Sequence, residues 1–408
     1  MVEQHGKTLV PQIRFAGFTD PWEQRKLSEL VEIERGGSPR PIERYITDDP
    51  CGLNWVKIGD APELGRYITQ TAEKIKPEGL AKTRQVYPGD LVLSNSMSFG
   101  RPYIMAIKGC IHDGWLLIRD AQKHFDPIFL CHMLGAPRML NQYRMFAAGS
   151  TVNNLNKELV GKAIVSLPSK DEQREIGIVL DRLDSLITLH QRKYDKLVIL
   201  KKSMLEKMFP KDGESVPEIR FAGFTDPWEQ RKASEVFQIV DDRGHPTLPV
   251  LSATQNQGMI YRDDSGRYIG HDESNEIGYK RVLPGDFVVH LRSFQGGFAH
   301  SQYEGITSPA YTVFRAKEPT SHSDRFWKHW FMSEHFIAGL STVTYGIRDG
   351  RSISVDEFMN TFLAFPAVEE QAAISRLFDY LDDLITLHQR KLELLQNIKK
   401  SLLDKMFV

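Results

Sequence analysis

The sequence predicts two globular α/β domains of the α+β kind, separated by an antiparallel pair of long coiled-coil helices and related by a pseudo-twofold internal repeat. The main observation is a duplication: residues 13–26 recur without a change as residues 219–232, and residues 186–193 recur as 384–391. The segments between these anchors differ almost completely. The chain is therefore two copies of one unit that share a frame and differ in content, as expected of a protein with two different reading heads.

The anchors and the changes in apolar periodicity divide the chain into five parts. Short apolar runs such as Leu91-Val-Leu93 are bounded by Gly, Pro and Asp, which predicts strands. The turn Pro88-Gly-Asp90 recurs as Pro284-Gly-Asp286, which aligns the two domains and indicates turn roles for both aspartates. The predicted parts are a first domain at 1–170 with a loose leader at 1–10, a first helix at 171–209, a linker at 210–216, a second domain at 217–369 and a second helix at 370–408.

Each predicted long helix carries an apolar seam at three- and four-residue spacing, and such a seam needs a partner. Acidic residues lie early in both helices and lysines lie late, which suits the helix dipole and favours antiparallel pairing, where each acidic half meets a basic half. The two seams consist of Ile176, Leu180, Leu183, Ile187, Tyr194, Leu197, Leu200 and Met204, and of Ile374, Phe378, Leu381, Ile385, Leu392, Leu395, Ile398 and Leu402.

The register of the pair follows from matching apolar layers. If the numbers of paired residues sum to 578, seven layers are apolar, from Ile176 with Leu402 to Met204 with Ile374, and His190 meets His388 at the midpoint. A slip of about one heptad would also be tolerated. We interpret the histidines as a polar layer that sets register, in preference to a metal site or a pH switch, because two histidines are an incomplete metal site. Helices of about 38 residues would span about 57 Å and act as a ruler.

Composition sets broad limits on location and partners. At 408 residues and 41% hydrophobic, the chain has enough material for two domain cores. Cys51, Cys110 and Cys131 include no Cys-x-x-Cys spacing, which argues against a disulfide framework or zinc site and favours a reducing cytoplasm. No long apolar run or signal peptide is visible. With a net charge of -1, any nucleic-acid surface must be gathered locally or completed by a partner.

The motifs that usually carry cofactors and catalysis are missing from the sequence. There is no Gly-x-Gly among the 30 glycines, Gly161-Lys162 is followed by Ala, no two prolines are adjacent, and no Asp or Glu stands two residues before a Lys. The run Thr19-Asp-Pro-Trp22 occurs at the start of both domains, so we interpret it as a turn with an anchoring tryptophan. The sequence therefore predicts a chain that is not an enzyme and holds no cofactor or metal.

The helix termini carry a family resemblance. Each long helix opens with Glu-Gln-x-x-Ile (residues 172–176 and 370–374) and closes with Lys-Met-Phe (residues 207–209 and 405–407). Together with the two variable domains, these motifs resemble the specificity subunit of a type I restriction-modification system. The resemblance implies two target-recognition domains that each read half of a bipartite site in double-stranded DNA. It also implies helices that dock two methyltransferase subunits, restriction subunits that attach through them, and S-adenosylmethionine and ATP bound on those partners.

Candidate DNA contacts are the polar residues of the segments that differ between the copies, because Arg suits guanine edges and phosphates while Asn and Gln suit adenine. Asn153-Asn-Leu-Asn156 is equally suited to capping a helix, and a solvated or turn-stabilising role stays open for every candidate. In the first domain the candidates are Ser38, Arg40, Lys57, Ser94, Asn95, Ser98, Arg101, Arg144, Ser150, Thr151, Asn153 and Asn154. In the second they are Arg243, His245, Ser252, Thr254, Gln255, Asn256, His290, Arg292, Ser293, Gln295, Tyr345, Arg348 and Arg351.

Two other functional classes are compatible with the residues alone. A nuclease or modification enzyme with an unrecognised site would methylate or cleave DNA as the purified chain. A coiled-coil adaptor with two protein-binding heads would show no affinity for DNA, even with its partners present. The most informative experiment is methylome sequencing of a host that carries the chain with its methyltransferase partner, because it would report both half-sites at once.

Overall fold

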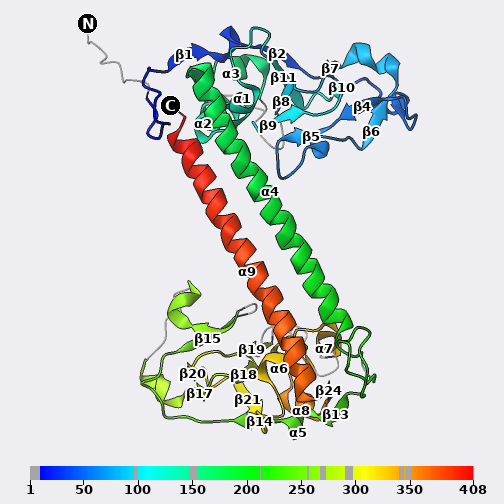
Figure 1. Ribbon diagram of the computed structural model, residues 1–408, viewed down its shortest axis with the longest axis vertical. Coiled ribbons are helices and arrows are strands. Elements are labelled where there is room, and N and C mark those ends of the chain that lie inside the picture. The colour runs from blue at the N-terminus through cyan, green and yellow to red at the C-terminus, as the bar shows by residue number, and fades with distance from the viewer. Residues whose placement is uncertain are drawn as a thin grey trace. The chain divides into compact units, whose positions relative to one another are not determined.

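The structure is a computed structural model whose helices and strands are labelled in Figure 1. It divides into two compact units, with residues 1–193 and 388–408 in unit 1 and residues 194–387 in unit 2. Each unit therefore contains one domain and a segment of both long helices. The structure describes residues 10–95, 100–147, 155–211, 213–254, 257–266, 273–289, 297–339, 344–345 and 352–407.

Unit 1 contains two five-stranded sheets and one two-stranded sheet. All strand pairs are antiparallel except β4–β10 and β5–β9. The first sheet has the order β3 (Ile46–Thr47), β6 (Glu73–Ile75), β4 (Leu53–Val56), β10 (Gly109–Ile111) and β7 (Arg84–Val86). The second has the order β2 (Glu32–Arg35), β11 (Trp115–Arg119), β8 (Leu91–Ser94), β9 (Pro102–Met105) and β5 (Tyr67–Ile68), and the third pairs β1 (Glu23–Lys26) with β12 (Ile164–Leu167).

The main core of unit 1 lies between the second sheet and three short helices. Leu93, Leu116 and Phe129 have no exposed surface, because the sheet face carrying these strand residues packs against the helices. Asp126 is the N-cap of the first of these helices, and its carboxylate accepts hydrogen bonds from the amides of Ile128 and Phe129. The three helices are α1 (Pro127–Leu134), α2 (Pro137–Ala147) and α3 (Lys157–Gly161).

Unit 2 contains the corresponding elements in smaller sheets. Its central sheet has the order β14 (Phe237–Val240), β21 (Thr312–Ala316), β18 (Phe287–Val289) and β19 (Phe298–His300). The two-stranded sheets are β13 (Glu229–Lys232) with β24 (Phe362–Phe365), β15 (Leu251–Thr254) with β16 (Gly258–Tyr261), β17 (Lys280–Val282) with β20 (Gly305–Thr307), and β22 (Thr344–Tyr345) with β23 (Ser352–Ile353). Its short helices are α5 (Ala233–Val236), α6 (Asp324–Trp330), α7 (Glu334–Gly339) and α8 (Val355–Asn360).

The core of unit 2 is aromatic. Phe237 contacts Phe314 with ring centroids 5.2 Å apart and Trp327 at the same centroid distance, and all three side chains are buried. Edge-to-face contacts of this kind add to the stabilisation that comes from the buried area alone. Both domains thus combine mainly antiparallel sheets with short helices, which confirms the predicted fold class.

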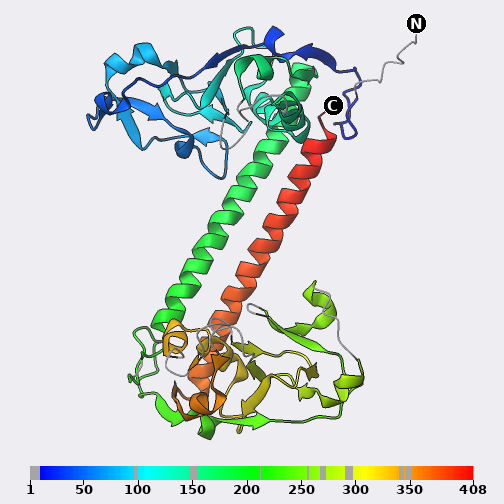
Figure 2. The same cartoon turned by 180° about the vertical axis from the view of Figure 1, so that it is seen from behind.

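The long helices are α4 (Lys170–Lys207) and α9 (Val368–Lys405), and their segments within each unit lie side by side in Figures 1 and 2. In unit 1, Asp184 of α4 pairs with Lys399 of α9 at 2.5 Å, and in unit 2 Lys201 pairs with Asp382 at 2.5 Å. The early acidic part of each helix thus meets the late basic part of the other. These contacts confirm the predicted antiparallel direction.

The histidine layer is also confirmed. His190 and His388, both in unit 1, lie with their Nδ1 atoms 2.8 Å apart. One ring nitrogen must be protonated and the other unprotonated for this contact to be a hydrogen bond, so at least one ring is neutral. Burial and the neighbouring Lys193 and Lys391 lower the pKa of both rings. Among the parts of the chain that the structure describes, no helix is both long and apolar enough for a membrane span.

The Lys-Met-Phe ends of the helices leave the helix axis and enter a core. Helix α4 ends at Lys207 and α9 at Lys405, two or three residues before the predicted limits, because the next residues pack inward. Phe407 contacts Phe129 in the core of unit 1, with ring centroids 5.4 Å apart. Likewise, Phe209 contacts Phe326 in the core of unit 2 at 5.8 Å. Each domain core is therefore completed by the far end of the helix that follows the other domain.

The repeated anchor segments dock each domain on its own helix. Arg14 and Glu172 form a two-contact ion pair with N···O distances of 2.7 and 2.8 Å, and the Glu172 side chain is 1% exposed. Arg220 and Glu370 repeat this pair at 2.7 Å. The later half of each anchor is a strand, β1 or β13, that pairs with β12 or β24 immediately before the helix. The anchors therefore have a structural reason to be identical.

The glutamines of the Glu-Gln motifs join the helix starts to the short domain helices. The Gln173 Oε1 accepts a hydrogen bond from the amide of Asp126, the N-cap of α1, at 2.8 Å. The equivalent Gln371 Oε1 accepts from the amide of Ser323, the N-cap of α6, at 3.0 Å. Both side chains are buried, so each motif fixes the angle at which a domain meets its helix.

We predict that Phe407→Ala destabilises unit 1 although the residue lies at the end of the chain. Removing a buried phenylalanine costs about 3 to 5 kcal/mol, through lost burial and the cavity left behind. Differential scanning calorimetry of the full chain should show a lower transition temperature for unit 1, whereas the equivalent Phe209→Ala should lower that of unit 2. The exposed neighbour Lys405→Ala is the control, and equal effects of Phe407→Ala and Lys405→Ala would contradict the assignment.

Candidate functional site

Three of the predicted contacts in the first domain line one hollow. Ser38, Arg40 and Lys57 border a cavity of about 680 Å³ next to the first five-stranded sheet. The Arg40 side chain is 83% exposed, and its nearest acid is Asp113 at 3.8 Å, so the guanidinium is available to a ligand. A loose, exposed ion pair of this kind contributes little to stability.

Acidic residues hold the other polar side chains of this hollow. The Ser38 hydroxyl donates to Asp113 at 2.9 Å, and Lys57 pairs with Glu73 at 2.5 Å. His112 also contacts Asp113, with Nε2 2.9 Å from Oδ1. The hollow therefore offers donors and acceptors at fixed positions, which is the arrangement that hydrogen bonding to base edges needs. Sequence reasoning missed His112, Asp113 and Glu73.

Two candidates from this domain are interior residues. The side chains of Ser94 and Asn95 are 0% and 2% exposed. The Ser94 Oγ accepts from the amide of Arg101, and the Asn95 Nδ2 donates to the carbonyl of Asp113 at 2.8 Å. Both side chains hold the backbone around them, and a contact of either one with DNA stays a prediction.

Two basic candidates are exposed. The Arg101 guanidinium lies 5.2 Å from the centre of the Tyr103 ring and donates to the carbonyl of Glu63. Arg144 lies on α2 and donates to Asn141 at 3.0 Å. Neither arginine borders the hollow of Ser38, so the structure does not gather all the candidates of this domain into one site.

In the second domain the described candidates occupy two segments. Arg243 pairs with Asp241 at 2.6 Å, and His245 contacts Asp242 at 2.8 Å, so both lie in one polar loop after β14. Ser252 and Thr254 belong to β15, and the Thr254 hydroxyl donates to the carbonyl of Gly258 across the hairpin turn at 2.8 Å. Thr254 therefore stabilises a turn, the alternative that the sequence left open.

For the remaining candidates the structure describes either the backbone alone or nothing. Tyr345 belongs to β22, but the placement of its side chain is not described. The candidates outside the described residues are Ser98, Ser150, Thr151, Asn153, Asn154, Gln255, Asn256, His290, Arg292, Ser293, Gln295, Arg348 and Arg351.

The residues predicted to stabilise turns and helix starts do so. Asp90 and Asp286 each accept a hydrogen bond from the backbone amide three residues earlier, at 2.9 and 2.8 Å, which closes the Pro-Gly-Asp turns. The Asn156 side chain caps α3 by accepting from the amide of Leu159 at 2.8 Å. The anchoring tryptophan Trp22 is 2% exposed.

An ionic cluster joins the first domain to the helices within unit 1. Arg66, which immediately precedes β5, has a 5% exposed side chain and contacts two aspartates of α4. Its Nη1 lies 3.0 Å from Asp181, and its Nη2 contacts Asp184. Asp184 also pairs with Lys399 of α9. We call this cluster, Arg66, Asp181, Asp184 and Lys399, joint 1.

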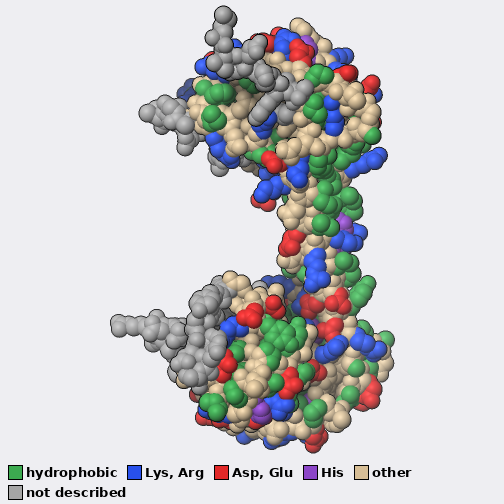
Figure 3. Space-filling model, turned by 90° about the vertical axis from the view of Figure 1, so that its left-hand side faces the viewer, with side chains coloured by type: hydrophobic (Ala, Val, Ile, Leu, Met, Phe, Trp, Pro, Cys, Tyr) green, Lys and Arg blue, Asp and Glu red, His purple; other side chains and the backbone are tan. Residues whose placement is uncertain are grey.

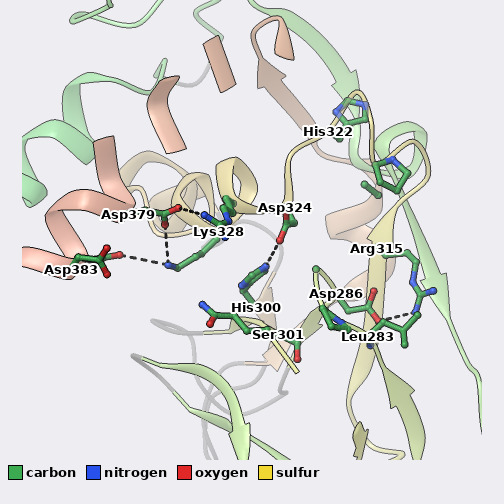
Figure 4. Close-up of a pocket in the computed structure, with 17 residues that line it drawn as sticks. Leu283, Asp286, His300, Ser301, Arg315, His322, Asp324, Lys328, Asp379 and Asp383 are labelled. Atoms are coloured by element: carbon green, nitrogen blue, oxygen red, sulfur yellow. Dashed lines mark hydrogen bonds and ion pairs between the residues drawn. The ribbon is translucent and has the colours of Figure 1, made fainter. Parts of the chain in front are cut away.

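The equivalent cluster in unit 2 has aspartates and a helix lysine at the same positions, but its additional cation comes from a different element. Asp379 and Asp382 occupy the helix positions of Asp181 and Asp184, and Lys201 occupies that of Lys399. The additional cation is Lys328 of α6, whose Nζ lies 3.6 Å from each aspartate. We call this cluster, Asp379, Asp382, Lys201 and Lys328, joint 2. Figure 4 shows Asp379 and Lys328 at one side of a cavity of about 930 Å³ that is also lined by the His300–Asp324 pair.

A buried histidine accompanies each joint. His132 on α1 and His329 on α6 are 6% and 0% exposed. Burial lowers the pKa of His132 to about 2, with smaller contributions from Arg66 and Lys399, and burial also lowers the pKa of His329. Both rings are therefore neutral near pH 7. The signal in the sequence is the pattern Phe-x-x-His, which recurs at 129–132 and 326–329 and which sequence reasoning missed.

Within the described residues, no group of three or more His, Cys, Asp or Glu side chains is placed to hold a metal ion. Burial raises the pKa of the Cys131 thiol to about 12 and that of the Cys110 thiol to about 11, so neither is a nucleophile near neutral pH.

We predict that His132 makes unit 1 sensitive to acid. Because its folded pKa lies near 2, its contribution to stability is complete above about pH 6.5. At lower pH the unfolded chain gains a proton that the folded chain does not, and the free energy of unfolding falls by about 1.4 kcal/mol per pH unit.

His132→Leu should therefore reduce the loss of transition temperature for unit 1 between pH 7.5 and pH 5.5, measured by calorimetry. Met133→Leu, at the neighbouring buried residue of α1, removes no titratable group, so it is the control and should keep the acid response of the unsubstituted chain. An unchanged acid response in His132→Leu would place the sensitivity elsewhere.

Comparison with known proteins agrees with this architecture. Residues 19–198 match the family described as the type I restriction modification DNA specificity domain. The type I restriction enzyme MjaVIII specificity subunit of Methanocaldococcus jannaschii is 22% identical over 412 residues, which cover 94% of this chain and 92% of that protein.

Two solved structures share the fold. The S subunit of a type I restriction-modification system from M. genitalium has a TM-score of 0.58 at 12% identity, covering 98% of this chain and 99% of that one. A chain from a structural study of assembly and conformational transition in a type I R-M system has a TM-score of 0.51 at 16% identity, covering 95% and 98%. Residues 19–198 thus match the DNA specificity domain of type I restriction-modification systems, and the whole chain, with its duplicated frame and paired helices, is similar to specificity subunits of such systems.

Proposed function

We propose that the two domains, at 1–170 and 217–369, each read one half of a bipartite site in double-stranded DNA. The observation that carries this proposal is that the domains use the same docking contacts on their helices, Arg14 with Glu172 and Arg220 with Glu370, while their loops differ. A shared frame with different loops provides two specificities at a defined separation. The paired helices then act as the ruler between the half-sites.

In the first domain, the hollow around Arg40 is the proposed base-reading surface. Arg40 and Lys57 would bind guanine edges or phosphates, and Ser38 and Asp113 supply further hydrogen-bonding groups. Arg101 and Arg144 are proposed phosphate contacts. In the second domain, we propose Arg243 and His245 together with Ser252, and the candidates outside the described residues complete both surfaces. The net charge of -1 leaves part of the phosphate contact to the partners.

We further propose that this chain is not catalytic and acts in the cytoplasm as part of a larger complex. Two methyltransferase subunits would dock on the helices, and the ATP-dependent restriction subunits would attach through them. S-adenosylmethionine and ATP would then be bound by those subunits and not by this chain. The missing cofactor motifs in the sequence support this division of labour.

The helices carry exposed apolar side chains that suit protein partners. In unit 1, Leu189 and Leu394 are 46% and 60% exposed, and in unit 2 Ile199 and Tyr380 are 68% and 61% exposed. Figure 3 shows hydrophobic side chains on the visible surface of the helical segments. Single exposed apolar residues are ordinary, but repeated ones on one element indicate an interaction surface.

We predict that Leu394→Asp and Ile199→Asp each weaken assembly with the methyltransferase subunits. A carboxylate would have to be desolvated in an apolar contact, which costs several kcal/mol. Both positions are exposed, so the transition temperature of the isolated chain should stay the same. Co-purification of the complex measures the effect, with Ile277→Asp as a control at a residue that is 64% exposed outside the long helices. Full assembly of both helix variants would contradict docking at these positions.

The recognition proposal is tested by exchanging the variable segments 27–170 and 233–369. Because the anchors at both junctions are identical, we expect the exchanged chain to fold and to assemble with the same methyltransferase. Methylome sequencing should then report the two half-sites in reversed order with the spacer nearly unchanged. The purified chain alone, given S-adenosylmethionine, should leave DNA unmodified. An unrelated recognition sequence, or soluble protein that no longer assembles, would show that the domains are not independent readers.

A further inference from the structure

Joint 1 contains Arg66, and the position of Arg66 can be matched to a residue of the second domain through the backbone hydrogen bonds. The amides of Met105 and Ser301 each donate to the carbonyl of the turn aspartate, Asp90 or Asp286, at 2.8 Å, so these residues are equivalent. Met105 pairs in parallel with Ile68, and Ser301 forms a parallel bridge with Met259. Ile68 and Met259 are therefore equivalent as well.

Counting back two residues gives the matched pair of interest. Arg66 precedes Ile68 by two residues, and Gln257 precedes Met259 by two. Arg66 is nearly buried and contacts both helix aspartates, whereas Gln257 is exposed. In joint 2, Lys328 and Arg325 of α6 and Lys201 of α4 surround the aspartates. The first domain therefore contacts the aspartates through a sheet residue, and the second contacts them through its α6 helix.

Arg66 is itself held firmly by the sheet. Its carbonyl accepts a hydrogen bond from the amide of Ile104 in β9 at 2.7 Å. Strand β9 lies between β8 and β5 in the sheet and pairs with both. Its guanidinium contacts Asp181 and Asp184, which are one helical turn apart on α4. One residue thus connects the β2-β11-β8-β9-β5 sheet to the helix through backbone and side chain at once. A glutamine at this position carries no charge and could not replace both ion pairs.

We infer that Arg66 is a positioning residue that fixes the first domain on α4 and so restricts the spacer length that the complex accepts. This inference rests on the proposed reading of a bipartite site. One added base pair moves a half-site by about 3.4 Å and rotates it by about 35° around the DNA axis. A domain that is clamped at its sheet as well as at its anchors cannot follow such a displacement, whereas a domain held without this clamp adapts more readily.

The test compares Arg66→Gln with Gln257→Ala in the assembled methyltransferase complex. Glutamine is the residue that the second domain carries at the same position, so the fold accommodates it. Methylation is measured on duplexes that contain both half-sites with the cognate spacer and with spacers one base pair shorter or longer. We expect Arg66→Gln to raise methylation of the altered spacers relative to the cognate spacer by about tenfold, the change that a modest interaction energy produces. Gln257→Ala should leave this ratio unchanged.

A structural role alone would lower methylation on all three duplexes in proportion, and that result would overturn the inference. If Arg66→Gln does not fold, Asp181→Asn provides the same test, because Asp181 is 37% exposed and its loss removes only one of the two contacts. Asp181→Asn should relax the spacer preference in the same direction, and an unchanged preference in folded protein would also overturn it. Failure of the proposed function is distinguishable, because the unsubstituted complex would then methylate no bipartite site.

Discussion

The arrangement of each unit depends on one buried ion pair. Arg14 with Glu172, and Arg220 with Glu370, join an anchor segment to the first turn of a long helix through two contacts each. A buried carboxylate that loses its partner costs about 3 to 5 kcal/mol, although a paired one adds little net stability. The pair therefore contributes mainly by specifying geometry: a domain that packed at another angle would leave a buried charge without its partner.

The same reasoning explains why the chain has so much variation between its repeated parts. Within a unit the anchor contacts both the Glu-Gln motif, through Arg14 and Glu172, and the Lys-Met-Phe end, through the amide of Ile13 and the carbonyl of Lys405, so a change in the anchor would disturb both contacts. Phe407, for example, packs on Phe129, and Phe129 also contacts Trp22. Selection can therefore alter the proposed reading surfaces without disturbing the docking.

The two units reach equivalent joints by different means. Both use two aspartates one turn apart on a helix, a lysine from the opposite helix and a neutral buried histidine. The cations that complete the joints come from a sheet position in the first domain and from α6 in the second. Duplication thus preserved the helix side of the contact, while the domain side diverged together with the loops.

The sequence was sufficient for the features that depend on periodicity and identity. The duplication, the strands around the Pro-Gly-Asp turns, the antiparallel pairing and the meeting of His190 with His388 were all predicted, because apolar spacing and charge order along a helix are local properties. The helix ends were predicted too long, since only the tertiary structure shows that Met208 and Phe209 turn into a core.

The individual site residues depended on tertiary structure for a physical reason. Whether a loop side chain is exposed is decided by distant segments that cover it, so Ser94 and Asn95 looked like available polar residues and are buried. No pattern in the sequence singles out Arg66, because the aspartates that it contacts lie more than one hundred positions away. The repeated frame was thus determined by the sequence alone, whereas the grouping of Ser38, Arg40 and Lys57 around one hollow was decided by the packing of strands that are far apart along the chain.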